Sequence, residues 1–135
     1  KLKKCKKVCI KMVKHNHLII RADIKKPPKD IRFVRKWLRK LVSAIGMKRL
    51  GQPVAHYVDI KGASGLTGFA LLQTSHISLH CWDEVVPSLL QLDVYSCKDF
   101  DKTIVFDFLK QFEPEGKIKY VTMDRETDIK IHNPI

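Results

Sequence analysis

Small hydroxyl residues and two histidines interrupt the apolar runs in the middle of this chain. The run from Phe69 to Gln73 has the length of a strand, and residues 77 to 82 alternate between apolar and polar side chains. Ser75 falls at the junction of these two predicted strands, eight residues after Thr67 and five before His80. If the first strand folds back on its neighbours, a nucleophilic hydroxyl, a second hydroxyl and an imidazole base can meet. The simpler alternative is that Thr74 and Ser75 only satisfy backbone groups in a tight turn.

Three blocks of residues in this order resemble the prokaryotic-type S-adenosylmethionine decarboxylase family. The segment from Gly65 to His80 resembles the family's Gly-x-Ser-Gly, apolar strand and Glu-Ser-His-x-x-x-His. His80-Cys81-Trp82-Asp83-Glu84 resembles its His-x-Trp-Pro-Glu, and Leu92-Asp93-Val94-Tyr95-Ser96-Cys97 resembles its apolar-Asp-apolar-Phe-Thr-Cys. Several ordered blocks are much harder to obtain by accident than one.

The resemblance implies a self-processing, pyruvoyl-dependent decarboxylase that acts on S-adenosylmethionine in spermidine synthesis. Amino-acid decarboxylation needs an electrophile that can hold a Schiff base and act as an electron sink, which no ordinary side chain does. Family members cut their chain before a serine and convert that serine into a pyruvoyl group. Here the cut would lie between Thr74 and Ser75, and Ser75 would supply the cofactor. Two fragments per protomer would then form a homodimer.

The resemblance also assigns roles to other residues. Thr67 would be the hydroxyl donor and His80 the base during processing, since this rearrangement needs both. Cys97 would return a proton to the substrate carbon, and Glu84 would bind ribose hydroxyls or the positive sulfonium. Tyr57, with His56 beside it, could stack on adenine. The alternatives are a small buried cysteine, a solvated carboxylate and ordinary core packing.

Departures from the family's pattern keep other functions open. Thr67 replaces a serine, Thr74 replaces a glutamate, Asp83 replaces a proline, and the gap from His80 to Cys97 is longer than usual. The family includes relatives that decarboxylate ornithine or arginine, and relatives that lack processing. A non-catalytic relative that serves as a regulatory or binding partner is therefore the main alternative.

Residue periodicity predicts an α+β fold. Leu18 to Ile24, Val54 to Ile60, Leu89 to Tyr95 and Ile118 to Met123 read as strands, in addition to the two around Ser75. Helices are predicted after Asp30, ending at Gly46, and after Asp101, with buried stripes at helical spacing. The loop from Lys61 to Gly65 precedes the Ser75 segment. We expect a two-layer sandwich, in which an antiparallel sheet carries helices on one face. The resemblance adds that two such protomers dimerise sheet to sheet.

Length and charge predict one domain at residues 15–135, preceded by a basic N-terminal arm at residues 1–14. The net charge is +12, and the first 50 residues hold 18 of the 26 Lys and Arg residues with only two Asp. Such asymmetry hints at nucleic acid. However, the aromatic residues of this half, Phe33 and Trp37, fall on the predicted buried stripe. We therefore expect a solvated basic arm and helix face, and nucleic-acid binding is disfavoured.

The remaining features predict a cytosolic protein without a metal. No apolar stretch approaches the roughly 20 residues that span a bilayer, and the basic N-terminus lacks the pattern of a secretory signal. The four cysteines are then expected as free thiols. Cys5, Cys9, His15 and His17 have no standard metal-site spacing, so a metal site there is the weaker interpretation.

Overall fold

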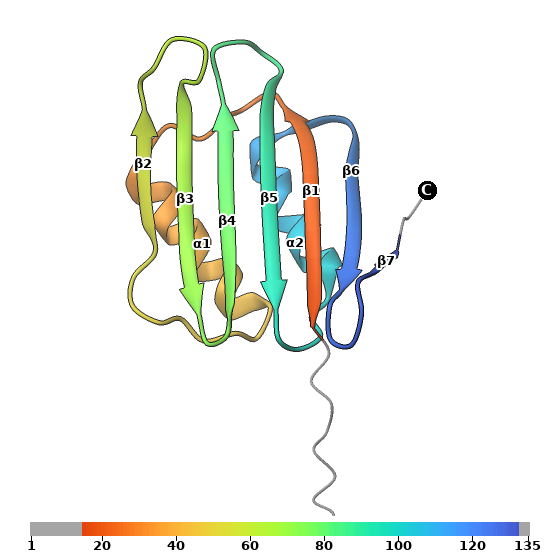
Figure 1. Ribbon diagram of the computed structural model, residues 1–135. Helices are drawn as coiled ribbons and strands as arrows, with labels where there is room; N and C mark the ends of the chain where they lie inside the picture. Colours follow the sequence, from red (N-terminus) through yellow and green to blue (C-terminus); the bar gives the residue numbers. More distant parts are fainter. Residues whose placement is uncertain (1–14, 133–135) are drawn as a thin grey trace, which may run out of the picture.

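One antiparallel sheet covered by two helices makes up the part of the chain that the computed structural model describes, residues 15 to 132. In chain order the elements are β1 (Asn16–Ile24), α1 (Ile31–Ala44), β2 (Val54–Val58), β3 (Gly65–Leu72), β4 (Ser75–Trp82), β5 (Ser88–Ser96), α2 (Lys102–Leu109), the short 3₁₀ helix η1 (Lys110–Phe112), β6 (Pro114–Asp124) and β7 (Lys130–His132). The seven strands lie in the order β2-β3-β4-β5-β1-β6-β7. Both helices pack behind the sheet in Figure 1, so residues 15 to 132 leave its front face uncovered.

Alternation along the strands creates one buried and one open face. In β4 the side chains of Ser75, Ile77, Leu79 and Cys81 are buried, whereas the intervening ones are more exposed. Successive strand residues point to opposite faces, so the buried set faces the helices. The core continues through Leu18, Ile20, Leu90, Leu92 and Val94 on the neighbouring strands. Each such residue stabilises the fold by about 1.5–3 kcal/mol when removed from water.

Helix α1 begins and packs as its sequence dictates. The Asp30 carboxylate caps it by accepting hydrogen bonds from the backbone N–H groups of Arg32 and Phe33. Its buried stripe consists of Val34, Trp37, Leu38, Leu41 and Val42. This stripe approaches the sheet closely at Gly68, where an added Cβ would lie 3.1 Å from Val34 and 3.2 Å from Leu38. The missing side chain at Gly68 therefore sets how near α1 lies to β3.

The predicted two-layer α+β architecture is confirmed, with differences at element ends. Strand β3 begins at Gly65, earlier than the predicted start at Phe69, because residues 65 to 68 already pair with β2. Only glycine fits at position 65, where φ is 155° and a Cβ would lie 1.9 Å from the Cys81 carbonyl oxygen. Strand β7 was not predicted, and it pairs with the end of β6. The basic segment 1–14 lies outside the described residues.

Candidate active site

Ser75 opens β4 directly after a two-residue turn. Leu72 pairs with Ser75 across the β3–β4 hairpin, so the turn consists of Gln73 and Thr74 alone. Thr74 has a φ of 54°, a left-handed conformation that is unfavourable for a β-branched residue and usually belongs to Gly or Asn. Such a residue stores about 1–3 kcal/mol of strain, and residues of this kind gather at functional sites. The strained residue immediately precedes the bond that sequence analysis selected for cleavage.

Cys97 lies against Ser75. The Cys97 backbone N–H donates a 2.9 Å hydrogen bond to Ser75 Oγ, and the Cys97 sulfur lies 3.8 Å from the Gln73 carbonyl oxygen. Neighbouring hydroxyls of Thr74 and Ser75 lower the pKa of the Cys97 thiol. Burial instead raises the pKa of Cys81 to about 12. Of the two cysteines in the described part of the chain, Cys97 therefore has the more readily ionised thiol.

Thr67 and His80 form a second group of side chains. They face each other in the β3–β4 register, and Thr67 Oγ1 hydrogen-bonds to His80 Nδ1. Both belong to the open face of the sheet, on which His56 of β2 is the other neighbour of Thr67 in register. A hydroxyl and an imidazole are thus held together as the sequence predicted, but without the serine.

The structure does not bring Ser75 to Thr67 and His80 within one chain. Five residue steps separate Ser75 from His80 along β4, which corresponds to about 17 Å at the usual rise of a strand. Because five is odd, the two side chains also point to opposite faces of the sheet, and accordingly Ser75 is 5% exposed while His80 is exposed. The expectation that the hairpin alone would unite all three is wrong.

Glu84 and Tyr57 lie at the Thr67–His80 end of the sheet, and each forms hydrogen bonds with residues of the neighbouring loops. Glu84 Oε1 accepts hydrogen bonds from the backbone N–H groups of Gly62 at 2.6 Å and Ser64 at 3.2 Å, and these bonds lower the pKa of Glu84. The Tyr57 hydroxyl donates to the Asp83 carboxylate at 2.9 Å. Glu84 therefore anchors the loop from Lys61 to Gly65 to the turn after β4, an interaction that the sequence did not predict.

Comparison with known proteins shows which family the chain belongs to. The family model described as S-adenosylmethionine decarboxylase matches residues 19–126. The chain belongs to the S-adenosylmethionine decarboxylase family.

Similarity to three archaeal proteins, each named S-adenosylmethionine decarboxylase proenzyme, agrees with this membership. The protein of Archaeoglobus fulgidus is 32% identical over 94 residues, which cover 68% of this chain and 78% of the relative. That of Picrophilus torridus is 36% identical over 67 residues (49% and 50%), and that of Pyrobaculum arsenaticum is 40% identical over 62 residues (45% and 48%). The matches indicate that this family member is a decarboxylase.

Sequence analysis of this decarboxylase-family chain missed a group of rings on the open face. The ring centres of His17, His76 and Tyr95 lie 5.5 to 6.4 Å apart. Asp93 lies 4.0 Å from His17 Nε2, which is buried and has no hydrogen-bond partner among the described residues. Burial lowers the pKa of His17. Strand alternation places all four residues on one face. The alternating positions of these residues along their predicted strands could therefore have identified the group from the sequence.

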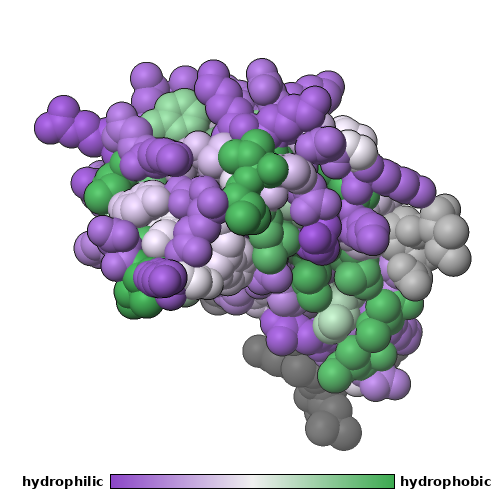
Figure 2. All heavy atoms as spheres, turned by 90° about the horizontal axis from the view of Figure 1, so that it is seen from above, coloured by the Kyte–Doolittle hydropathy of each residue, from purple (hydrophilic) through white to green (hydrophobic). Residues whose placement is uncertain are grey.

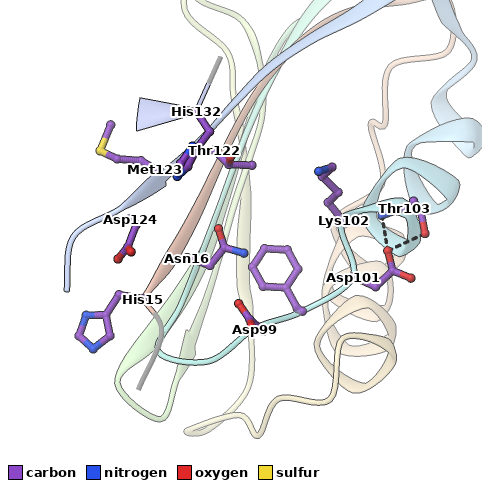
Figure 3. Close-up of a pocket in the computed structure, with 11 residues that line it drawn as sticks. His15, Asn16, Asp99, Asp101, Lys102, Thr103, Thr122, Met123, Asp124 and His132 are labelled. Atoms are coloured by element: carbon purple, nitrogen blue, oxygen red, sulfur yellow. Dashed lines mark hydrogen bonds between the residues drawn. The ribbon is translucent and has the colours of Figure 1, made fainter. Parts of the chain in front are cut away.

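A polar cavity of about 500 Å³ lies at the end of the sheet where β5 gives way to the Cys97 loop. His15, Asn16, Asp99, Asp101, Lys102 and Asp124 are among its lining residues, and Figure 3 shows them converging from the start of β1, the end of β6 and the start of α2. Asp101 is already engaged, because it caps α2 through the Thr103 N–H and hydroxyl. The volume of this cavity is in the range of small-molecule sites.

The described residues contain neither a metal-type cluster nor a membrane-spanning helix. Within residues 15 to 132, His, Cys, Asp and Glu side chains form no group of three or more suited to a metal ion. Cys5 and Cys9, which belonged to the weaker metal interpretation, lie outside that range. Neither helix of the described segment is both long and apolar enough to cross a bilayer.

Proposed function

We propose that this chain is a self-processing decarboxylase of S-adenosylmethionine whose pyruvoyl group derives from Ser75. The observation that carries the proposal is the strained Thr74–Ser75 turn beside Cys97, in a chain whose relatives are named proenzymes. When formed, the pyruvoyl group supplies a carbonyl that accepts the electrons released as carbon dioxide leaves. All other tasks fall to the residues of this chain.

Processing begins at the Ser75 hydroxyl. Its oxygen attacks the Thr74 carbonyl carbon while its proton leaves, and the peptide nitrogen becomes an amine as the acyl group moves to oxygen. Loss of the Ser75 α-proton then expels the Thr74 carboxylate and leaves a double bond, and hydrolysis of the resulting enamine releases ammonia. The surroundings of Ser75 suit this sequence, because the Cys97 N–H holds its oxygen in position and Thr74 holds strain that cleavage would release.

The helper residues would come from a second copy of the chain. Thr67 and His80 cannot reach Ser75 of their own chain across about 17 Å, and a general base must lie within about 3.2 Å of its proton or act through one water. In a two-fold dimer built on the open faces, each copy would bring its Thr67–His80 pair to the end of the other's sheet where Ser75 lies. The Ser75 hydroxyl faces the helices in the uncleaved chain, so the Thr74–Ser75 turn would have to rotate toward the open face for the contact to form. This geometry supports the sheet-to-sheet homodimer expected from the sequence.

Substrate recognition would divide between the same two groups. Cys97 would return a proton to the substrate carbon. The polar cavity at the start of α2, which neither Cys97 nor Ser75 lines, has carboxylates suited to a cationic substrate. Glu84 and Tyr57 are exposed at the end of the sheet that carries the Thr67–His80 pair, and we assign both to the nucleoside end of the substrate. Tyr57 pairs with the buried Leu66, so it would act from the opposite face to Thr67. The proposal places the reaction in the cytosol and in spermidine synthesis. Ornithine and arginine remain the competing substrates.

Denaturing mass spectrometry and a carbon dioxide assay test the proposal together. The purified chain should yield a fragment ending at Thr74 and a second fragment whose first residue carries a ketone that reacts with hydrazides. Ser75→Ala should stay intact, and labelled carbon dioxide should be released from S-adenosylmethionine faster than from ornithine or arginine. An intact wild-type chain that releases no carbon dioxide from any of the three would favour the non-catalytic alternative.

A further inference from the structure

The outward side of α1 carries a row of positive charges that the described residues do not pair with acidic ones. Arg32, Lys36 and Lys40 are exposed, and Arg35 and Arg39 lie half-buried beside them. Among residues 15 to 132, none of these five side chains forms an ion pair. We call them the basic face. It extends about 12 Å along the helix from Arg32 to Lys40.

This arrangement weakens the isolated helix. Arg32–Lys36, Arg35–Arg39 and Lys36–Lys40 are spaced four residues apart, and like charges at that spacing each cost about 0.2–0.5 kcal/mol. Asp30 is the only acidic residue between positions 25 and 49, and its carboxylate is used to cap α1. Repulsion that the chain does not relieve internally would be relieved by a polyanion.

An aromatic groove adjoins the basic face where the chain enters α1. Phe33 is 42% exposed and lines a cavity of about 570 Å³ with Lys26, Pro27, Pro28, Lys29, Asp30, Gln111 and Phe112. The one carboxylate in this lining, that of Asp30, is already used to cap α1. The Lys26 N–H donates to the Phe112 carbonyl at 3.1 Å, which fixes one wall of the groove. Figure 2 views the molecule from the end where β1 connects to α1 in Figure 1, and hydrophilic residues cover most of this surface with a few apolar ones between them.

The exposure of Phe33 corrects the sequence-based argument against nucleic acid. That argument placed both Phe33 and Trp37 on the buried stripe of the helix. Trp37 is 3% exposed, donates its indole N–H to the Phe108 carbonyl and packs on Phe112, as expected for a core residue. Phe33 contacts Phe112 edge-on but leaves part of its ring accessible in the groove. An accessible ring among lysines is the arrangement that sequence analysis judged to be missing.

We propose that the basic face and the Phe33 groove bind single-stranded nucleic acid. Phosphates of the strand lie along Arg32, Lys36 and Lys40, and one unpaired base stacks on Phe33. A duplex keeps its bases stacked and cannot insert one into a groove, whereas every single-stranded base has a free π-face. A lipid surface fits less well, because the accessible ring lies in a concavity instead of projecting from the helix. The proposal does not depend on the decarboxylase proposal.

Fluorescence anisotropy of a labelled 20-nucleotide oligouridine with the full-length chain tests this surface. Lys36→Glu/Lys40→Glu should weaken binding at least tenfold in 0.1 M salt, and should flatten the slope of log Kd against log salt by about one unit or more. The control Lys117→Glu/Lys130→Glu makes the same charge change at exposed sites outside the basic face and should have a much smaller effect. The lysines of residues 1–14 are present in both variants, so their contribution cancels.

A second variant tests the stacking step without changing charge. Phe33→Ala should weaken oligouridine binding at least about fivefold, as expected for the loss of one stacked base, and Phe33→Tyr should restore it. Equal affinities for the two charge variants would overturn the proposal, and so would a Phe33→Ala protein that binds like wild type. Vesicles containing phosphatidylglycerol are the competing probe. If they bind through these residues and oligouridine does not, the partner is a membrane surface and the proposal is wrong.

Discussion

Mixing Ser75→Ala with His80→Ala chains tests whether one site is built from two copies. Each variant alone lacks one member of every site and should remain uncleaved. In a mixed dimer, the Ser75 of the His80→Ala chain faces the intact His80 of the other chain, so one of the two sites is complete. The second site lacks both residues, so the Ser75→Ala chain is not cleaved. The separation of Ser75 from His80 along β4 is the structural reason for this expectation.

The size of the effect follows from two-fold pairing. Equal amounts of the two variants that exchange freely give about half mixed dimers. About half of the His80→Ala chains should therefore be cleaved, and none of the Ser75→Ala chains, which amounts to about one quarter of all chains. Giving one variant a mass tag identifies the source of each fragment.

The variants should be mixed before folding, or exchanged under mild denaturant, so that mixed dimers form. Intact-mass spectrometry over time then gives the cleaved fraction of each chain. Size-exclusion chromatography with light scattering verifies that dimers are present. If mixed dimers are present and both variants stay intact, or if His80→Ala cleaves alone, the two-copy site is refuted. The first result would mean that His80 acts within its own chain, and the second would remove His80 from processing.

Two further predictions concern the thiol and the backbone. Cys97→Ala should still be cleaved but should lose most turnover; in the wild type, kcat/KM should fall as pH rises through a pKa below 9.0, because the thiol must be protonated to donate and its neighbours lower that pKa. A cleavage defect in Cys97→Ala, or an alkaline limb unchanged in Cys97→Ser, would contradict this role. Gly65→Ala should destabilise the fold by about 3 kcal/mol or more in chemical denaturation, since its Cβ would overlap the Cys81 carbonyl. Gly51→Ala, which also has a positive φ but open space around it, should cost only about 1 kcal/mol.

The elements of the fold were accessible from the sequence because their signals are local. Asp30 and Asp101 cap the helices as predicted, and Gly46 follows α1. Alternation in β4 correctly separated buried from open positions. The contact between Ser75 and Cys97 was not accessible in this way, since it depends on β5 ending beside the β3–β4 turn. Cross-strand neighbours of this kind follow from strand order and register, which a single sequence does not specify.

Two errors in the sequence analysis have different physical origins. The meeting of Ser75 and His80 in one chain was excluded by strand parity, which the sequence already contained: residues five apart on a strand point to opposite faces. The exposure of Phe33, in contrast, could not be predicted from the sequence. Phe33 does follow the apolar stripe of α1, but it lies in the first turn, where the sheet no longer covers it and Phe112 shields only one side. Helical spacing identifies a face and does not show where that face ends.

A sheet-to-sheet dimer would account for three features that share no contact in the single chain. The open face carries half-buried apolar side chains and the His17–His76–Tyr95 rings. Both helices pack on the other face of the sheet, so they do not cover these side chains. His17 Nε2 is buried there without a hydrogen-bond partner among the described residues, which is costly unless another surface supplies one. The Thr67–His80 pair lies on the same face, far from the serine it is proposed to assist. A second copy on this face would provide a cover and a source of donors and acceptors, and it would bring the turn that carries its Ser75 to the Thr67–His80 end of the sheet, whereas a monomer provides none of them.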